Sequence, residues 1–341
     1  MKITSLYIKN FRNLQPGLKL DFESGINLIL GQNGSGKTNL LESLSILSGW
    51  GAFSRTKNLI TWDNPSQNAL ISAKISGEEN FTVNANISSK ISIKLFDKPI
   101  SCTDLRLILP SMIFLTSDVN LIDSSPAARR LFIDRLCALF VPVYAKKLSD
   151  FKFIARKRAA LLKENKSPES TSILFCQLGG FIMSTRRKVL NLLRDLFPAD
   201  KLLLEFLPII KPDSCEKYLQ EFIKRESLRE RKAQRVICGP SFDELAINLA
   251  DSNRPAADSL SRGQKRRLIL YIIITAGKLI ESRLKRAPVL LLDDFTSELD
   301  SQGREFVQSE LIKTGWQIFI TAPEKPFRTI KQFGEINFTR F

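Results

Sequence analysis

The sequence predicts an α/β fold in which both ends of the chain build one domain and the middle forms an inserted helical lobe. Three observations support this. Short β-rich segments fill the first 100 residues, helical segments follow from about residue 125 to residue 235, and β-character then returns. We therefore expect residues 1–123 and 236–341 to form a split domain with an antiparallel β part, and residues 124–235 to form the inserted lobe.

Local patterns predict the elements of the split domain. Turn-like breaks such as SGEEN separate five partly alternating segments that predict strands: KITSLYIKNF (2–11), INLILG (26–31), NALISAKIS (68–76), NFTVNANIS (80–88) and KISIKLF (90–96). One helix interrupts this set, at about residues 38–48. The second half predicts a helix at 261–284, a buried strand at 287–295, a helix at 301–314 and a last strand at 316–322.

The inserted lobe is predicted to be helical and basic. Its first helix begins at Ser125, a plausible N-cap followed by Pro126, the second starts near Pro168, and CEKYLQEFIKRESLRERKAQR (215–235) gives a third. Residues 144–240 hold 21 Lys and Arg against 11 Asp and Glu, a net charge of +10 out of +16 for the whole chain. Such a surplus favours contact with a polyanion, although a solvated basic helix surface is the alternative.

Composition excludes several classes of protein. The chain has no histidine, and its five cysteines are widely spaced and form no CxxC, which makes zinc chemistry improbable and fits reduced thiols in the cytosol. The longest apolar run, at 268–280, contains Lys278 and is too short to span a bilayer. We expect a cytoplasmic protein with no signal peptide and no membrane partner.

A glycine-rich loop after the strand INLIL predicts a nucleotide site. Its residues fit G-x-x-x-x-G-K-[ST] at every fixed position: Gly31, Gln32, Asn33, Gly34, Ser35, Gly36, Lys37 and Thr38. Glycines let successive backbone N–H groups turn inward, and the following helix directs its positive dipole end at the same point. We expect Lys37 to reach the β- and γ-phosphates of ATP and the Thr38 hydroxyl to ligate Mg²⁺.

Two acidic residues end the buried strand VLLLDDF, residues 289–295. We expect Asp293 to hold Mg²⁺ beside Thr38, and Asp294 to polarise the attacking water. A solvated acidic pair at a strand end is the alternative, and the complete glycine loop argues against it.

The segment LSRGQKRR, residues 260–267, opens a helix about 30 residues before the acidic strand. Ser261, Gly263 and Gln264 leave hydroxyl and backbone N–H groups free to hold phosphate. Because a second phosphate socket would be redundant within one chain, we expect this one to face the γ-phosphate bound by a partner chain. An ordinary capped helix is the alternative.

These segments resemble a known family. LSRGQ resembles the signature of ABC-type ATPases, SELD (297–300) resembles their D-loop, and IKNFRN (8–13) resembles the start of the SMC, Rad50 and RecF proteins. Nearly end to end, the chain is most similar to the RecF family of bacterial recombination mediators. SSPAARRLFIDRL (124–136) also resembles that family, and SLSRGQKRRLIL and LLLDDFTSELD have its spacing.

The resemblance implies an ABC-type ATPase head that carries an inserted helical lobe, with Arg12 among its nucleotide-binding residues. ATP and Mg²⁺ would be its cofactors, and ATP would join two heads into a dimer. Its partners would be duplex, gapped or junction DNA, the mediators RecR and RecO, and indirectly the RecA recombinase. Slow hydrolysis would release the DNA.

Two departures from the expected patterns stand out. The chain reads GPSFDE (239–244) where the family has GPHRDD, so Ser241 and Phe242 replace a histidine and an arginine. Thr321 stands where transporter-type ABC ATPases carry a histidine. Two alternatives therefore stay open: a DNA-binding module with a degenerate ATPase, and another ABC-type chromosome-maintenance ATPase.

Overall fold

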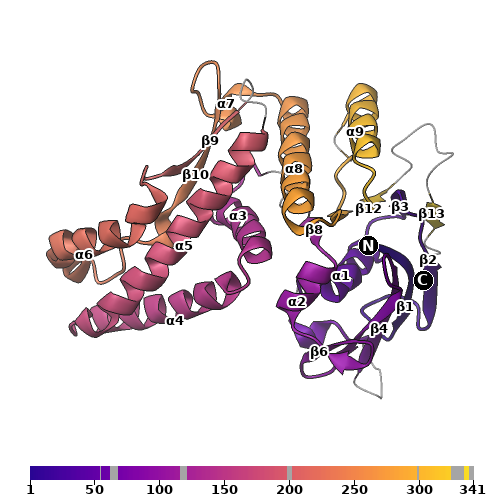
Figure 1. The fold of residues 1–341 in the computed structure, drawn as a ribbon, viewed down its shortest axis with the longest axis horizontal. Coiled ribbons are helices and arrows are strands. Elements are labelled where there is room, and N and C mark those ends of the chain that lie inside the picture. Colours follow the sequence, from indigo (N-terminus) through magenta and orange to yellow (C-terminus); the bar gives the residue numbers. More distant parts are fainter. Residues whose placement is uncertain are drawn as a thin grey trace. The chain divides into compact units, whose positions relative to one another are not determined.

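The computed structural model describes residues 1–53, 55–61, 68–115, 121–197, 202–297, 299–323 and 334–337. The chain divides into two compact units, which are labelled by element in Figure 1. Unit 1 comprises Met1–Val119 and Arg262–Phe341, and unit 2 comprises Asn120–Ser261. Among the described helices, none is long and apolar enough to cross a membrane.

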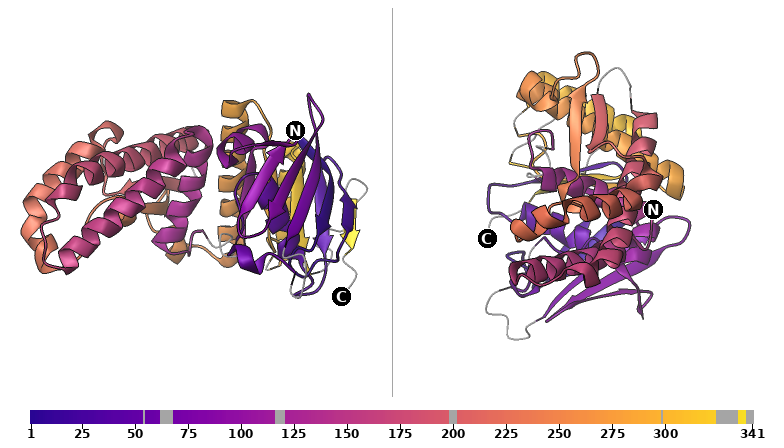
Figure 2. Two further views of the ribbon diagram at one scale, coloured as in Figure 1. Left: turned by 90° about the horizontal axis from the view of Figure 1, so that it is seen from below. Right: turned by 90° about the vertical axis from the view of Figure 1, so that its left-hand side faces the viewer.

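A six-stranded antiparallel sheet forms one part of unit 1. Its strand order is β2-β1-β4-β5-β6-β7, and Figure 2 shows these strands side by side. The strands are β1 (Lys2–Lys9), β2 (Leu18–Asp21), β4 (Ala69–Ser76), β5 (Phe81–Ile87), β6 (Ile91–Leu95) and β7 (Lys98–Pro99). Alternate residues of β4 and β5 are buried, which is the pattern of a sheet with one face on a core.

A five-stranded sheet forms the second part, in the order β13-β3-β12-β11-β8, with every pair parallel. The strands are β3 (Ile26–Leu30), β8 (Ser111–Phe114), β11 (Val289–Leu292), β12 (Ile318–Ala322) and β13 (Gly334–Asn337). All residues of β3, β8, β11 and β12 are buried, as expected for a parallel sheet covered on both faces. Neither β8 nor β13 is predicted by the sequence patterns above.

The helices of unit 1 are α1 (Lys37–Leu47), α2 (Cys102–Ile108), α8 (Arg262–Leu284) and α9 (Ser301–Thr314), with a short 3₁₀ turn η1 (Thr56–Asn58). One continuous core joins α1 to both sheets. Leu44 of α1 lies in it with Ile71 of β4 and Phe319 of β12. This core fixes the start of α1 against the ends of the parallel strands, where the predicted nucleotide loop lies.

Unit 2 contains the predicted inserted lobe. Its helices are α3 (Pro126–Phe140), α4 (Tyr144–Lys163), α5 (Glu169–Leu196), α6 (Cys215–Lys232) and α7 (Ala256–Ser259), with 3₁₀ turns η2 (Pro212–Ser214) and η3 (Pro240–Phe242). Both α4 and α6 pack against the long α5 (Figure 1). Ser125 caps α3 by accepting from the Ala128 N–H, as the sequence suggests. The segment then divides into α3 and α4, because Pro142 disfavours a helical Val141.

Unit 2 is not wholly helical. Strand β9 (Leu202–Leu207) pairs antiparallel with β10 (Glu244–Leu249). Because this pairing ties residues 236–261 to the lobe, the second break between compact units falls after Ser261 rather than at the predicted position 235/236. Sequence patterns miss this because β9 lies between two long helices and its partner is about 40 residues away.

Candidate nucleotide-binding site

The loop Gly31–Gly36 connects β3 to α1, and its glycines are required by geometry. Gly34 and Gly36 adopt φ values of 84° and 100°, a region that side chains disfavour. A Cβ on Gly36 would also lie 2.7 Å from Cδ2 of Leu14. At the start of the loop, the Gly31 N–H donates to the carbonyl of Ala322 in β12, 3.3 Å away.

Lys37 begins α1 and folds back over the loop. Its Nζ donates to the carbonyls of Gly31 at 2.6 Å and Gln32 at 2.9 Å. Burial lowers the pKa of Lys37, and the carboxylates of Asp294 and Asp293 oppose that shift. The ammonium is therefore held by loop carbonyls close to two acids.

Asp293 follows β11 and joins two hydroxyls. Thr38 Oγ1 lies 3.0 Å from Oδ1 and 3.1 Å from Oδ2 of Asp293, and Thr321 Oγ1 donates to Oδ1 at 2.7 Å. Asp293 is buried, and its N–H donates to the Phe114 carbonyl of β8 at 2.8 Å. The predicted pair of Thr38 and Asp293 is thus in direct contact.

Asp294 has a different environment from its neighbour. Its backbone is left-handed, with φ of 52°, and its N–H donates to Thr321 Oγ1 at 2.9 Å. Oδ1 is buried and has no hydrogen-bond partner among the described residues. Burial raises the pKa of this carboxyl. A strained, partly desolvated acid with a spare acceptor is typical of a functional position.

These groups line one pocket of about 320 Å³: Asn33, Gly34, Gly36, Lys37, Thr38, Asn39, Asp293, Asp294 and Thr321. Ser35, next to it in the loop, has a buried Oγ with no partner among the described residues. The spare hydroxyl and carboxylate oxygens, the ammonium and the start of α1 fit a polyphosphate and an oxygen-seeking divalent cation. The residues present therefore fit ATP with Mg²⁺.

Arg12 does not line this pocket. Its Nε and Nη2 donate to Oε2 of Glu42 at 2.9 and 2.7 Å, and Glu42 is 1% exposed. Its neighbour Asn13, which no sequence motif singles out, donates to the Gly34 carbonyl at 3.0 Å and accepts from Asn39. The IKNFRN segment thus supports the glycine loop through Asn13, and a contact of Arg12 with nucleotide stays a prediction.

The predicted second socket lies apart from the pocket lining. Ser261, Gly263 and Gln264 are exposed at the start of α8, and Arg266 anchors that helix by donating to the Phe295 carbonyl at 2.7 Å. In the D-loop segment, Asp300 caps α9 by accepting from Gly303 N at 2.7 Å. Glu298 lies outside the described residues. Ser261, Gly263 and Gln264 are exposed, and their contact with a second chain stays a prediction.

Comparisons with known proteins identify the family. The sequence model of the RecF/RecN/SMC N terminal domain matches residues 2–336. The DNA replication and repair protein RecF of Leptospira interrogans is 30% identical over 346 residues, covering 95% of this chain and 92% of its own. The chain belongs to the RecF family. RecF of Heliobacterium modesticaldum is 28% identical and covers 100% of this chain and 97% of its own.

Solved structures agree with the RecF fold. The recombination mediator protein RecF-ATPrS of the RecFOR pathway superposes with a TM-score of 0.85 at 23% identity, covering 98% of this chain and 96% of its own. An Smc head bound to the C-winged helix domain of ScpA gives a TM-score of 0.54 at 16% identity, covering 95% of this chain and 90% of its own. The predicted ABC-type ATPase head with an antiparallel β part is confirmed.

Proposed function

We propose that this RecF-family ATPase of DNA repair and recombination is a clamp timed by ATP. ATP joins two copies of the chain on DNA, and slow hydrolysis separates them. The observation that carries the proposal is the single pocket that brings together Lys37, Thr38, Asp293 and Asp294. The pocket brings Lys37 and Thr38 together with two acids that lie about 255 residues further along the chain. The arrangement is therefore a product of the fold.

Each residue of the pocket has a distinct role in this proposal. The N–H groups of the glycine loop and Lys37 bind the phosphates, with the ammonium moving from its loop carbonyls to phosphate oxygens. Thr38 and Asp293 are the residues that would hold Mg²⁺, which when bound neutralises charge on the phosphates. Asp294 accepts a hydrogen bond from the attacking water through its spare oxygen.

The exposed start of α8 supplies the second side of the nucleotide. We assign Ser261, Gly263 and Gln264 to the γ-phosphate bound by the partner copy, because they offer N–H and hydroxyl donors yet lie outside their own pocket. ADP lacks that phosphate, so the partner copy loses its contact after hydrolysis. Two DNA-binding surfaces then act together only while ATP is present.

DNA is the partner that the charge favours. The net charge is +16, and +10 of it lies in residues 144–240. Relatives bear the name DNA replication and repair protein RecF, and the solved relative belongs to the RecFOR pathway. We propose that this chain likewise binds duplex or gapped DNA, acts with RecR and RecO mediators, and assists loading of the RecA recombinase in the cytoplasm.

Phosphate release with and without duplex DNA tests the proposal. The wild type should hydrolyse ATP slowly, and Lys37→Met should abolish both turnover and ATP-driven dimerisation. Affinity for DNA should fall with salt at a log–log slope of at least about −3, because each neutralised phosphate contributes roughly −0.9. Full turnover by Lys37→Met would refute the assignment of the site. DNA binding by a wild type that releases no phosphate would favour the degenerate module.

A further inference from the structure

A second pocket lies within unit 2, far along the chain from the nucleotide loop. It has a volume of about 300 Å³ and is bounded by α3, α4, α5 and η3. Its walls are mainly apolar, from Leu131, Leu148, Phe151 and Pro240, and its polar lining includes Arg130, Asp134, Lys152, Arg186 and Ser241. This volume is at the lower end of ligand pockets, which hold about 300–1,000 Å³.

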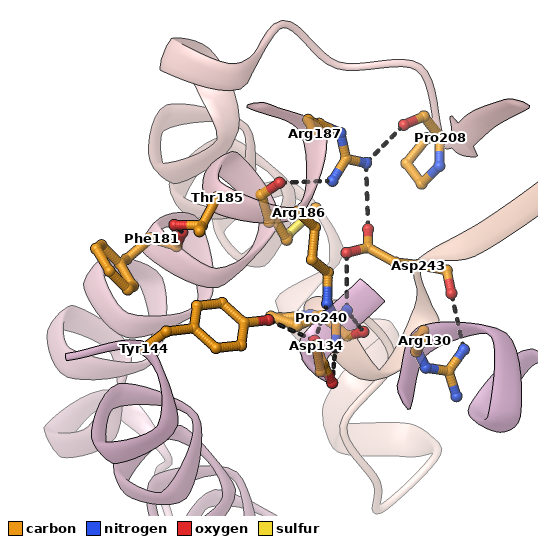
Figure 3. A network of polar contacts seen from close by, with 11 residues as sticks. Arg130, Asp134, Tyr144, Phe181, Thr185, Arg186, Arg187, Pro208, Pro240 and Asp243 are labelled. Atoms are coloured by element: carbon orange, nitrogen blue, oxygen red, sulfur yellow. Dashed lines mark hydrogen bonds and ion pairs between the residues drawn. The ribbon is translucent and has the colours of Figure 1, made fainter. Parts of the chain in front are cut away.

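The acids around this pocket already have partners. Asp134 accepts from Arg186 Nε at 2.8 Å and Nη2 at 3.0 Å, and also from the Tyr144 hydroxyl (Figure 3). Asp243, which is fully buried, accepts from Arg186 Nη1 at 3.1 Å and Arg187 Nη2 at 3.2 Å. Two carboxylates therefore neutralise two guanidinium groups.

Arg130 makes no ion pair with a carboxylate among the described residues. Among the described residues its side chain makes one hydrogen bond, from Nη1 to the Asp243 carbonyl at 2.7 Å (Figure 3). Burial and the nearby charge of Arg186 lower the pKa of Arg130, and the carboxylates of Glu244, Asp243 and Asp134 oppose that shift. Lys152, exposed on α4, adds a second positive charge and makes no ion pair among the described residues. An anion placed here would be attracted by both Arg130 and Lys152.

The rim of the pocket is apolar and exposed. Leu131 is 46% exposed, and Phe242, the neighbour of the lining residue Ser241, is 52% exposed. Exposed aromatic and aliphatic groups around an arginine are typical of the centre of protein–protein interfaces. Duplex DNA needs an open cationic surface, whereas this pocket offers Arg130 and Lys152 between apolar walls. A single side chain with a neighbouring carboxylate fits it better.

We propose that this pocket, here called the Arg130 pocket, docks a partner protein through an apolar side chain that lies beside a carboxylate. The side chain enters between Leu131, Leu148 and Phe151, and the carboxylate accepts from Arg130 with support from Lys152. The carboxylate is the free C-terminus of the partner, and the apolar side chain is that of the partner's last residue. This site is separate from the nucleotide pocket and contributes no group to hydrolysis.

Small probes test the Arg130 pocket on the full-length protein. N-acetyl-leucine carries an isobutyl group and a carboxylate, and N-acetyl-leucinamide lacks the charge. We expect the acid to bind with roughly millimolar affinity, as its size permits, and to shift the methyl resonances of Leu131 and Leu148. The amide should bind about tenfold more weakly, because charge-assisted hydrogen bonds are lost.

Charge-removing variants locate the contact. Arg130→Gln should lower the affinity for N-acetyl-leucine about tenfold. Lys152→Gln should lower that affinity severalfold and leave the fold intact, since Lys152 is exposed. Lys224→Gln is the matched control, an exposed lysine on α6 in the same unit that should leave affinity unchanged. If Arg130→Gln does not fold, the affinity of Lys152→Gln for N-acetyl-leucine is compared with that of Lys224→Gln instead.

Three results would overturn the proposal. Equal binding of acid and amide would exclude a carboxylate contact, and equal effects of the pocket variants and Lys224→Gln would exclude this location. If a 20-base-pair duplex displaces N-acetyl-leucine and Arg130→Gln weakens DNA binding at least tenfold more than Lys224→Gln, the pocket is a DNA phosphate contact instead.

Discussion

The nucleotide pocket of unit 1 and the arginine–aspartate network of unit 2 differ in the hydrogen bonding of their buried acids. The network consists of Asp134, Asp243, Arg186 and Arg187. In the network, Asp134 and Asp243 both accept from guanidinium groups and Arg186 uses all its nitrogens, while Nε of Arg187 is the buried atom without a partner among the described residues. In the nucleotide pocket, Oδ1 of Asp294 and Oγ of Ser35 are buried without partners among the described residues. Partnered charges hold helices in place, whereas spare acceptors beside a cavity indicate a ligand.

Backbone geometry shows the same contrast. Gly34, Gly36 and Asp294 all have positive φ values at the nucleotide pocket. Asp134 and Arg186 instead project from the regular helices α3 and α5. Helices place side chains with little strain, but aiming several N–H groups at one point requires an irregular loop. The nucleotide pocket therefore concentrates backbone strain that Asp134 and Arg186, on their regular helices, do not have.

The largest predicted effect is the difference in stability between a variant of the network, Asp243→Asn, and a variant of the nucleotide pocket, Asp294→Asn. Asp243→Asn removes the acid between two buried arginines, and breaking such a pair by losing one partner costs about 3–5 kcal/mol. Asp294→Asn should leave stability unchanged or slightly raise it, because burial already disfavours its charged form. Peptide-resolved hydrogen exchange measures the protection of α5 in unit 2 and of α1 in unit 1 separately. Equal protection of α5 in both variants would contradict the contrast.

A pair of glycine variants sharpens the account of strain. Gly36→Ala adds a methyl 2.7 Å from Leu14 Cδ2 at φ of 100°, whereas Gly34→Ala meets nothing within 4 Å at φ of 84°. Strained residues cost on the order of 1–3 kcal/mol. We expect Gly36→Ala to destabilise unit 1 by more than Gly34→Ala, measured by urea unfolding with tryptophan fluorescence. The reverse order would show that the loop repacks freely.

The smallest effect concerns Thr321, whose hydroxyl joins Asp293 to the backbone of Asp294. Thr321→Val keeps the shape but removes both hydrogen bonds, so we expect hydrolysis to slow about tenfold with a raised requirement for Mg²⁺. Thr321→Ser should retain most of the activity. Initial rates across a Mg²⁺ titration measure both the hydrolysis rate and the Mg²⁺ requirement. Identical Mg²⁺ curves for Thr321→Val and the wild type would exclude a positioning role.

The glycine loop and the acidic strand could be predicted because each is a local pattern with a fixed spacing. The role of Thr321 could not. It depends on the register of β11 and β12, in which Leu292 pairs with Ile320 and so brings Asp293 beside Thr321. Local patterns do not predict the role of Asn13 either, because its contact with Gly34 exists only after β1 and the loop have folded together.

The extent of the lobe could be predicted only in part. Its first boundary and its helices follow from caps, prolines and composition, which act locally. Strand β9 and its pairing with β10 depend on a long-range antiparallel register, and this pairing moves the second boundary to Ser261. The Arg130 pocket depends on helices and a turn that meet only in the folded chain.

DNA residence time together with solution mass, measured in ATP and in ADP, tests the central claim that ATP joins two copies of the chain. Ser261→Arg places bulk and positive charge at the start of α8, so it should bind ATP and stay monomeric. Asp294→Asn retains Thr38 and Asp293 but cannot polarise water, so it should dimerise in ATP and remain on DNA longer than the wild type. A normal dimer of Ser261→Arg, or release of Asp294→Asn as fast as the wild type, would contradict the clamp.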